Sequence, residues 1–425
     1  VVLWRKRRPI RHRQLAFRSH ELHHAEELQV VLNPPFALVL AGGGARGAYE
    51  AGVLRFILGD LPRRIGHPVR PDLICGSSVG GLNGAAIGAW NGDPQGTVEL
   101  SSFWNELSVA DIYRFEALDL LRSPMRLLRG PADNELAWVD ARPLHSVMRE
   151  FFPWDKLRSC IDEGRLGALV LTATDVHSGR IIQFIDTRQE WEPLDPRYGI
   201  QREFTRINAD HVLASCAIPF LFPPISIDGR AMVDGSLRQN TPISPALRMG
   251  AEYALVVGTR YPRPPVEPEE DSPLPSTPAL LGKALNSLLL DPLHQDMAQI
   301  EFINGILEAG VEAFGANFTE RINATLKTRS KRTLRQVKTL SILPSEDLGR
   351  VAKTVWDPKS VDTTKGTRFM LSQIAGSGEE SDLLSYLLFD SSYTRIIEDL
   401  GYQDASRRET EIIAFLEEVV ATQGN

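Results

Sequence analysis

The sequence predicts an α/β fold built around a mostly parallel sheet. Short apolar segments of strand length alternate with segments of helical length along the chain. Two of the apolar segments run straight into glycine-rich turns that open a helix, in "FALVLAGGGARGAYEAGVL" and "DLICGSSVGGLNGAAIGAW". This alternation of strand, turn and helix is typical of parallel sheets with helices packed on their faces.

The expected elements follow one another in a regular order. The strand "FALVLAG" leads into a helix over 48–58, which places Ala51, Leu54 and Leu58 on one face. The strand "DLIC" leads into a second helix, and the region 100–165 is mainly helical. Later strands are expected at 167–176, 180–186 and 252–259, and a final strand, "TLSILP", precedes helices in "DLLSYLLFD", "YTRIIEDL" and "ETEIIAFLEEVVA".

Composition changes divide the chain into segments. These are a basic leader at 1–33, an α/β core at 34–260, a Pro-rich acidic linker at 261–278, a helical insertion at 279–338, and a returning strand with C-terminal helices at 339–425. The first 18 residues hold seven Lys or Arg and no acidic residue, although the whole chain has a net charge of −7. A solvated tail is the favoured interpretation of such an arm, and contact with anionic lipid headgroups or with nucleic acid is the alternative.

Composition also excludes several classes of protein. The chain of 425 residues is 43% hydrophobic and 24% charged, as expected of a globular protein. Its cysteines, Cys75, Cys160 and Cys216, are too few and too scattered for a disulfide framework or a zinc cluster. No group of His, Cys or acidic residues has metal-ligand spacing, so neither a metal nor a cofactor is expected. No apolar run reaches membrane-spanning length and no secretory signal precedes the core, which predicts a cytoplasmic protein with peripheral membrane contact as an open alternative.

The first glycine turn allows two interpretations. Gly42, Gly44 and Gly47 fit the G-x-G-x-x-G pattern of a dinucleotide-binding turn, and they equally suit a loop of backbone N–H groups aimed at an oxyanion. A dinucleotide site needs an acidic residue at the end of the second strand, where this chain has "GSSVGG". A phosphate-binding P-loop fails too, because Ala48 and Tyr49 stand where Lys and Ser or Thr are required.

The second glycine turn predicts a catalytic serine. Gly76-Ser77-Ser78-Val79-Gly80 fits the G-x-S-x-G nucleophile elbow, between a strand and a helix as that motif requires. Gly76 and Gly80 permit the tight turn and close packing, Ser78 is the central nucleophile candidate, and Ser77 is a supporting hydroxyl.

A serine hydroxyl needs a base to accept its proton. His294, inside the helical insertion beside Pro292, would make a poor triad with the expected order. Two Asp-Gly pairs are better placed. Asp228-Gly229 falls at a hairpin tip between "ISI" and "RAMV", whereas Asp234-Gly235 follows a strand end, so Asp234 is the favoured base.

Three blocks of the sequence together resemble a known family. "AGGGARGAYEAGVL", "GSSVGGLNGA" and "AIPFLFPPISIDGRAMVDGSLRQNTPI" are similar, in this order, to the signature blocks of patatin-like phospholipases, across residues 35–260. The resemblance implies a three-layer α/β/α sandwich and ester hydrolysis by a Ser–Asp dyad, here Ser78 and Asp234. It implies an oxyanion hole in the glycine loop, to which Arg46 belongs by its position; the loop residues concerned are Gly42, Gly43, Gly44, Arg46 and Gly47. In the acid block, Ser236 follows Gly235 where the family usually has Gly or Ala.

The function expected from this resemblance is lipid acyl hydrolysis. An acyltransferase that uses the same acyl-enzyme is the first alternative, and a non-catalytic nucleotide-binding module is the second. A lipid or acyl ester is the expected partner and no nucleic acid is expected. The helical spacing of apolar residues in 278–307 suits either a lid or membrane-facing surface, or a helix pair packed on the sandwich, and packing is favoured. Acyl length, headgroup and oligomeric state stay open.

Overall fold

The structure is a computed structural model, and it describes residues 35–115, 139–150, 152–188, 199–219, 221–262, 293–330, 333–375 and 382–423. The leader at 1–33, nearly all of the linker and the insertion up to residue 292 lie outside the described residues. The predictions made for those segments therefore stay predictions.

A sheet forms the centre of the part of the molecule that the structure describes. Its nine strands there are β1 (Phe36–Leu40), β2 (Leu73–Ser77), β3 (Ala168–Asp175), β4 (Ile181–Thr187), β5 (Ile200–Phe204), β6 (Ile225–Ile227), β7 (Arg230–Asp234), β8 (Tyr253–Val257) and β9 (Lys338–Ile342). The main path has the order β5-β4-β3-β2-β1-β8-β9, in which β3, β2, β1, β8 and β9 are parallel. β4 is antiparallel to β3 and carries β5 parallel to itself. The predicted mostly parallel α/β sheet is confirmed.

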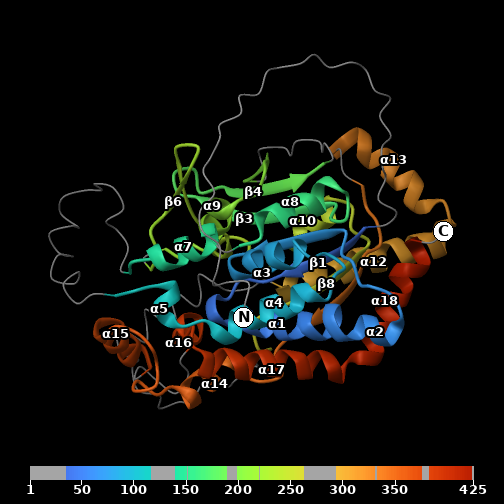
Figure 1. Cartoon of the computed structure of the whole chain (residues 1–425). Coiled ribbons are helices and arrows are strands. Elements are labelled where there is room, and N and C mark those ends of the chain that lie inside the picture. Colours follow the sequence, from blue (N-terminus) through green and yellow to red (C-terminus); the bar gives the residue numbers. More distant parts are fainter. Residues whose placement is uncertain are drawn as a thin grey trace, which may run out of the picture.

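Helices cover both faces of this sheet (Figure 1). Along β1 the side chains of Phe36, Leu38 and Leu40 enter one hydrophobic core, and those of Ala37 and Val39 enter a second core on the opposite face. This period of two is what a strand buried on both faces requires. The molecule therefore has the three layers expected of an α/β/α sandwich.

The helices make up the two outer layers and the C-terminal part of the molecule. They are α1 (Gly47–Leu54), α2 (Leu61–Ile65), α3 (Val79–Gly88), α4 (Gln95–Glu106), α5 (Val109–Ile112), α7 (Arg142–Glu150), α8 (Trp154–Asp162), α9 (Ala209–Ser215), α10 (Ile243–Arg248), α12 (Leu293–Phe314), α13 (Phe318–Ser330), α14 (Leu348–Val355), α15 (Lys365–Ala375), α16 (Asp382–Leu387), α17 (Ser391–Arg407) and α18 (Glu409–Gln423). A π-helical turn, η2 (Arg55–Asp60), joins α1 to α2, so the first helix is longer than the 48–58 predicted. In the described part of the chain, no helix is both long and apolar enough to cross a bilayer.

A hairpin beside β3 brings the acid block to the nucleophile turn. Asp228 and Gly229, with φ of 50° and 76°, form the two-residue tip between β6 and β7, as the sequence predicts. β2 pairs with β3 as far as Ser77 opposite Thr172, and β7 then pairs with the same side of β3, with Asp234 opposite Ala173. The end of β7 thus lies directly beyond the end of β2.

The described part of the insertion packs along the sheet. Leu293 at the start of α12 lies close to Gly258, just after β8, whereas Asn304 donates to the Val337 carbonyl oxygen at 2.9 Å, just before β9. Ile300 and Leu307 are buried, and α13 lies at the opposite end of the molecule from α16 (Figure 1). α12 thus packs on the sandwich, and it begins at the edge of the sheet where the parallel strands β2 and β8 end.

Candidate active site

Ser78 occupies a strained turn between β2 and α3. Its φ of 52° and ψ of −127° put a residue with a side chain in a region that is usually reserved for glycine. A Cβ atom at Gly76 would lie 2.4 Å from the Gly80 carbonyl oxygen, and one at Gly80 would lie 2.4 Å from the Leu40 carbonyl oxygen. Both flanking positions therefore need glycine for close packing, and the turn presents the Ser78 hydroxyl at the helix N-terminus.

The Ser78 hydroxyl donates to the Asp234 carboxylate. The distance from Ser78 Oγ to Asp234 Oδ2 is 2.7 Å, and both side chains are buried. The second carboxylate oxygen, Oδ1, accepts the Ser236 N–H at 2.8 Å, which fixes the orientation of the carboxylate. The pairing of β7 with β3, described above, is what places this acid one step beyond the nucleophile.

Burial changes the acidity of Asp234. Loss of hydration raises the pKa of Asp234 to about 6, although the hydrogen bonds from Ser78 and from the Ser236 N–H both favour the charged form. A carboxylate with this pKa is basic enough to accept a proton and is still mostly ionised at neutral pH. The Ser78 hydroxyl thus lies within one hydrogen bond of a carboxylate whose pKa suits proton transfer near neutral pH.

The glycine loop lies between the end of β1 and the start of α1. The Gly42 N–H donates to the Asn240 carbonyl oxygen at 3.0 Å, so this predicted oxyanion donor is already used inside the protein. The first hydrogen bond of the following turn, η1 (Gly44–Arg46), runs from the Arg46 N–H to the Gly43 carbonyl oxygen at 3.1 Å. The N–H groups of Gly43 and Gly44 precede that bond, as donors at the start of a helix do.

The other two loop positions have different surroundings from those predicted. The Arg46 side chain makes its contacts with α16, including an ion pair with Asp382 at 2.8 Å, so in this structure it is engaged away from the Ser78–Asp234 pair. Gly47 is the first residue of α1, and a Cβ atom there would lie 2.3 Å from a methyl group of Val79. Gly47 therefore allows α1 to pack closely against the nucleophile turn.

Small residues surround the acid turn. A Cβ atom at Gly235 would lie 2.3 Å from the Thr172 carbonyl oxygen, so glycine is needed for the turn to pass β3. The Ser236 hydroxyl lies 3.3 Å from that of Ser77, and its backbone N–H is the group that bonds Asp234. Ser77 and Ser236 thus join the two turns, as the predicted supporting role of Ser77 implies.

Sequence reasoning missed Ser215 and Cys216 at the end of α9. The Ser215 hydroxyl accepts the Ser78 N–H at 2.9 Å and donates to the Thr172 carbonyl oxygen at 2.7 Å, so it fixes the nucleophile turn against β3. Burial and the neighbouring Asp234 carboxylate raise the pKa of the Cys216 thiol, which disfavours a competing thiolate. The two residues precede "AIPFLFPP" directly, but no spacing rule marks them.

A buried polar network also joins the glycine loop to the nucleophile helix. Asn83 of α3 donates to the Gly47 carbonyl oxygen and to Glu50 Oε2, both at 2.9 Å, and accepts the Trp104 ring N–H at 3.0 Å. Burial raises the pKa of Glu50 well above its ordinary value. Trp104, which completes this network, is itself buried.

The remaining site candidates lie elsewhere. Asp228 is exposed at the hairpin tip, and His294 lies in the first turn of α12. The hydroxyl of Ser78 donates to Asp234, so among the candidate bases Asp234 is the one that the structure places in hydrogen-bond contact with it. Among the described residues, no three His, Cys, Asp or Glu side chains gather in a way that would hold a metal ion.

Comparison with known proteins places this geometry in a family context. Residues 38–247 match the model of the patatin-like phospholipases. A curated relative, the uncharacterised protein YjjU of Escherichia coli strain K12, is 26% identical over 227 residues, which cover 52% of this chain and 51% of that protein. The match thus spans about half the length of this relative.

Two solved structures are also similar to this chain. Human GIVD cytosolic phospholipase A2 in complex with methyl gamma-linolenyl fluorophosphonate is 14% identical, with 94% of this chain and 61% of that chain covered and a TM-score of 0.41. VipD from Legionella pneumophila is 15% identical, with 92% of this chain and 77% of that chain covered and a TM-score of 0.31.

Proposed function

Through residues 38–247 this chain belongs to the patatin-like phospholipase family, and we propose that it hydrolyses carboxylic esters of lipids with Ser78 as nucleophile and Asp234 as base. The observation that carries the proposal is the 2.7 Å hydrogen bond from Ser78 Oγ to Asp234 Oδ2 at a strained strand-to-helix turn. Family membership by itself supports a lipid hydrolase, and the dyad supplies the chemistry.

Acylation forms one bond and breaks another. Ser78 Oγ attacks the ester carbonyl carbon while its proton passes to Asp234 Oδ2, and a tetrahedral oxyanion results. When that intermediate collapses, the bond to the alcohol oxygen breaks, and the protonated Asp234 returns its proton to the leaving alcohol. The acyl group is then esterified to Ser78.

Deacylation repeats these steps with water. Asp234 accepts a proton from a water molecule that attacks the acyl carbon, and then returns a proton to Ser78 Oγ as the fatty acid leaves. No further base is required, since one carboxylate alternates between the two protonation states. The pKa of about 6 suits this alternation near neutral pH.

The N–H groups of Gly43 and Gly44 are the proposed donors to the oxyanion. They are the first donors of a loop in which Gly44 has a φ of 56°, a conformation that glycine adopts without strain. Donors held rigidly toward developing charge contribute a factor of about 10² to 10³ each to the rate.

The pKa of Asp234 predicts how activity depends on pH. Below about pH 6 the carboxyl group is protonated and cannot accept the Ser78 proton, so kcat/KM should fall by about tenfold for each further pH unit. The test measures fatty-acid release from a soluble short-chain ester between pH 4.5 and 8, with circular dichroism at each pH to verify folding. A profile that stays flat down to pH 5 in the folded protein would contradict the proposed base.

The substrate class is tested with a panel of lipids. Phospholipids, lysophospholipids and neutral glycerides with matched acyl chains are incubated with the full chain, and released fatty acid is quantified by mass spectrometry. We expect release from at least one class, and the preferred class identifies the substrate. Parallel reactions with an added alcohol acceptor separate the alternatives, because a transferase would yield a new ester in place of free fatty acid.

A further inference from the structure

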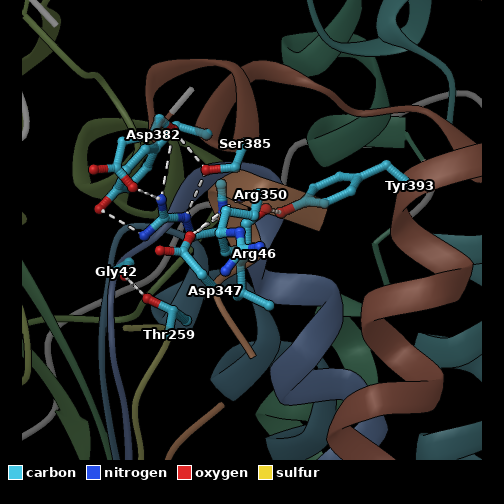
Figure 2. A network of polar contacts seen from close by, with 11 residues as sticks. Gly42, Arg46, Thr259, Asp347, Arg350, Asp382, Ser385 and Tyr393 are labelled. Carbon is cyan, nitrogen blue, oxygen red and sulfur yellow. Dashed lines mark hydrogen bonds and ion pairs between the residues drawn. The ribbon is translucent and has the colours of Figure 1, made fainter. Parts of the chain in front are cut away.

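Arg46 is a buried cation held by the C-terminal part of the chain. Its side chain is 5% exposed, and its guanidinium forms an ion pair with Asp382 at 2.8 Å. Arg46 Nε donates to the Ser385 hydroxyl at 2.8 Å, and the guanidinium carbon lies 4.2 Å from the centre of the Tyr386 ring. Figure 2 shows how the carboxylate and the hydroxyl converge on this one side chain.

The same helix touches the backbone of the glycine loop. A Cβ atom at Gly44 would lie 2.3 Å from the Tyr386 carbonyl oxygen, so α16 packs directly on the loop residue that has a positive φ. On the other side of the loop, Thr259 Oγ1 donates to the Gly42 carbonyl oxygen at 2.6 Å (Figure 2). The loop is thus held between the end of β8 and α16.

α16 is itself anchored within the C-terminal helices. The Tyr113 hydroxyl donates to the Leu387 carbonyl oxygen at 2.9 Å, and Asp382 lies beside Gly349 in the first turn of α14. Asp347 caps that turn, and the Tyr393 hydroxyl of α17 donates to the Leu348 carbonyl oxygen at 3.2 Å (Figure 2). Because α14, α16 and α17 form one packed unit, α16 gives Arg46 a fixed partner.

We propose that Asp382 and Ser385 are positioning residues of the reaction, which hold Arg46 and, through it, the Gly43 and Gly44 N–H groups toward the oxyanion. These two residues lie outside the stretch 38–247 that matches the family, so the C-terminal segment completes a site whose dyad lies elsewhere. The inference rests on the proposed hydrolase function. In this inference Arg46 holds the glycine loop in place. It does not bind a lipid phosphate, because its charge is already paired with Asp382.

The test compares Asp382→Ala and Ser385→Ala with the wild type in the full chain. Loss of loop alignment should lower kcat on a soluble ester by about 10²-fold in Asp382→Ala and less in Ser385→Ala, which keeps the ion pair, with KM little changed. A trifluoromethyl ketone analogue forms a tetrahedral oxyanion on the serine, so its affinity should fall by the same factor as kcat/KM.

Glu398→Gln is the matched control. It removes another ion pair between the N-terminal helices and the C-terminal helices, that of Arg55 with Glu398 at 3.2 Å, which does not touch the glycine loop. We expect no change in kcat or in analogue affinity. Asp382→Ala itself leaves a buried cation unpaired, so Ser385→Ala keeps the inference testable if the first variant does not fold.

The outcomes distinguish the positioning role of Asp382 and Ser385 from the proposed hydrolase function. A folded variant at Asp382 or Ser385 with unchanged kcat and analogue affinity would overturn the positioning role while the hydrolase function stands. A fall in kcat that merely follows the fraction of folded protein, and is matched by Glu398→Gln, would overturn it as well. A wild type that cleaves no ester would overturn the proposed function, and this inference with it.

Discussion

Replacing Ser78 with alanine is expected to lower ester hydrolysis by about 10⁴-fold or more, because removal of the nucleophile leaves only binding and oxyanion stabilisation. The loss should appear in kcat for every ester that the wild type cleaves. It should also abolish covalent labelling by a fluorophosphonate, which reacts with an activated serine. Both are measured on the same preparations, by fatty-acid release and by intact-protein mass.

Ser77→Ala is the matched control for that substitution. Ser77 is a buried neighbouring serine in the same turn, and its hydroxyl contacts that of Ser236 at 3.3 Å instead of a base. We expect it to remain labelled and to keep most of its activity. Equal activity in Ser78→Ala and the wild type would mean that the nucleophile lies elsewhere, and labelling that disappears in Ser77→Ala alone would assign it to the wrong serine.

The local pattern of the sequence predicted most of the sheet. β1, β3 and β8 fall inside segments that were expected to be strands, and β2, β4 and β9 overlap theirs with one end displaced by one or two residues. Runs of branched and aliphatic residues between turn signals identify buried strands well, but not their exact ends. The Asp228-Gly229 tip was equally predictable, since a two-residue turn with positive φ favours these residues. β5 was missed, because its residues, Ile200–Phe204, are only partly buried and mix charged with apolar side chains.

The contacts that complete the site were beyond local reasoning. Ser78 and Asp234 are 156 residues apart, and they meet because β7 pairs with the part of β3 that β2 leaves free. Neither the length of β3 nor the choice of its partner is encoded in the motif itself. The three family blocks predicted that these residues act together, whereas the pairing explains how.

The surroundings of the glycine loop also depend on residues far away in the sequence, which a local motif does not predict. The sequence motif assigned the glycines of this loop and Arg46 to one oxyanion hole. In the structure, however, the Gly42 N–H donates to the Asn240 carbonyl oxygen, and the Arg46 side chain forms an ion pair with Asp382. Arg46 and Asp382 are 336 residues apart, and α16 shows no motif that links it to the loop. A pattern can indicate which residues form a loop, but the donors that stay available depend on what packs around it.

Replacing Asp234 with asparagine is expected to lower the activity and to raise the stability of the fold. The amide cannot accept the proton of Ser78, so kcat should fall by about 10⁴-fold, as for other isosteric replacements of a catalytic carboxylate. The fold should nevertheless become more stable. In the wild type the pKa of Asp234 is raised from 3.8 to about 6 by burial, so the folded state binds its proton more tightly than the unfolded state does.

The sign of the stability effect follows from that difference. As pH rises from about 4 to about 6, the wild type must ionise a buried group, and it loses up to about 3 kcal/mol of unfolding free energy that the neutral asparagine does not lose. The difference in unfolding free energy between Asp234→Asn and the wild type should therefore grow between about pH 4 and pH 6 and stay constant above pH 6. Urea unfolding at several pH values measures it, beside kcat on one soluble ester.

Asp228→Asn, at the other Asp-Gly pair of the hairpin, provides the control. Asp228 is exposed and has a φ of 50°, which asparagine tolerates equally well, so activity and stability should both match the wild type. If Asp234→Asn is inactive because it is unfolded, its urea midpoint will fall instead of rising. If it is stable and still active, Asp234 orients Ser78 without accepting its proton, and another group must serve as the base.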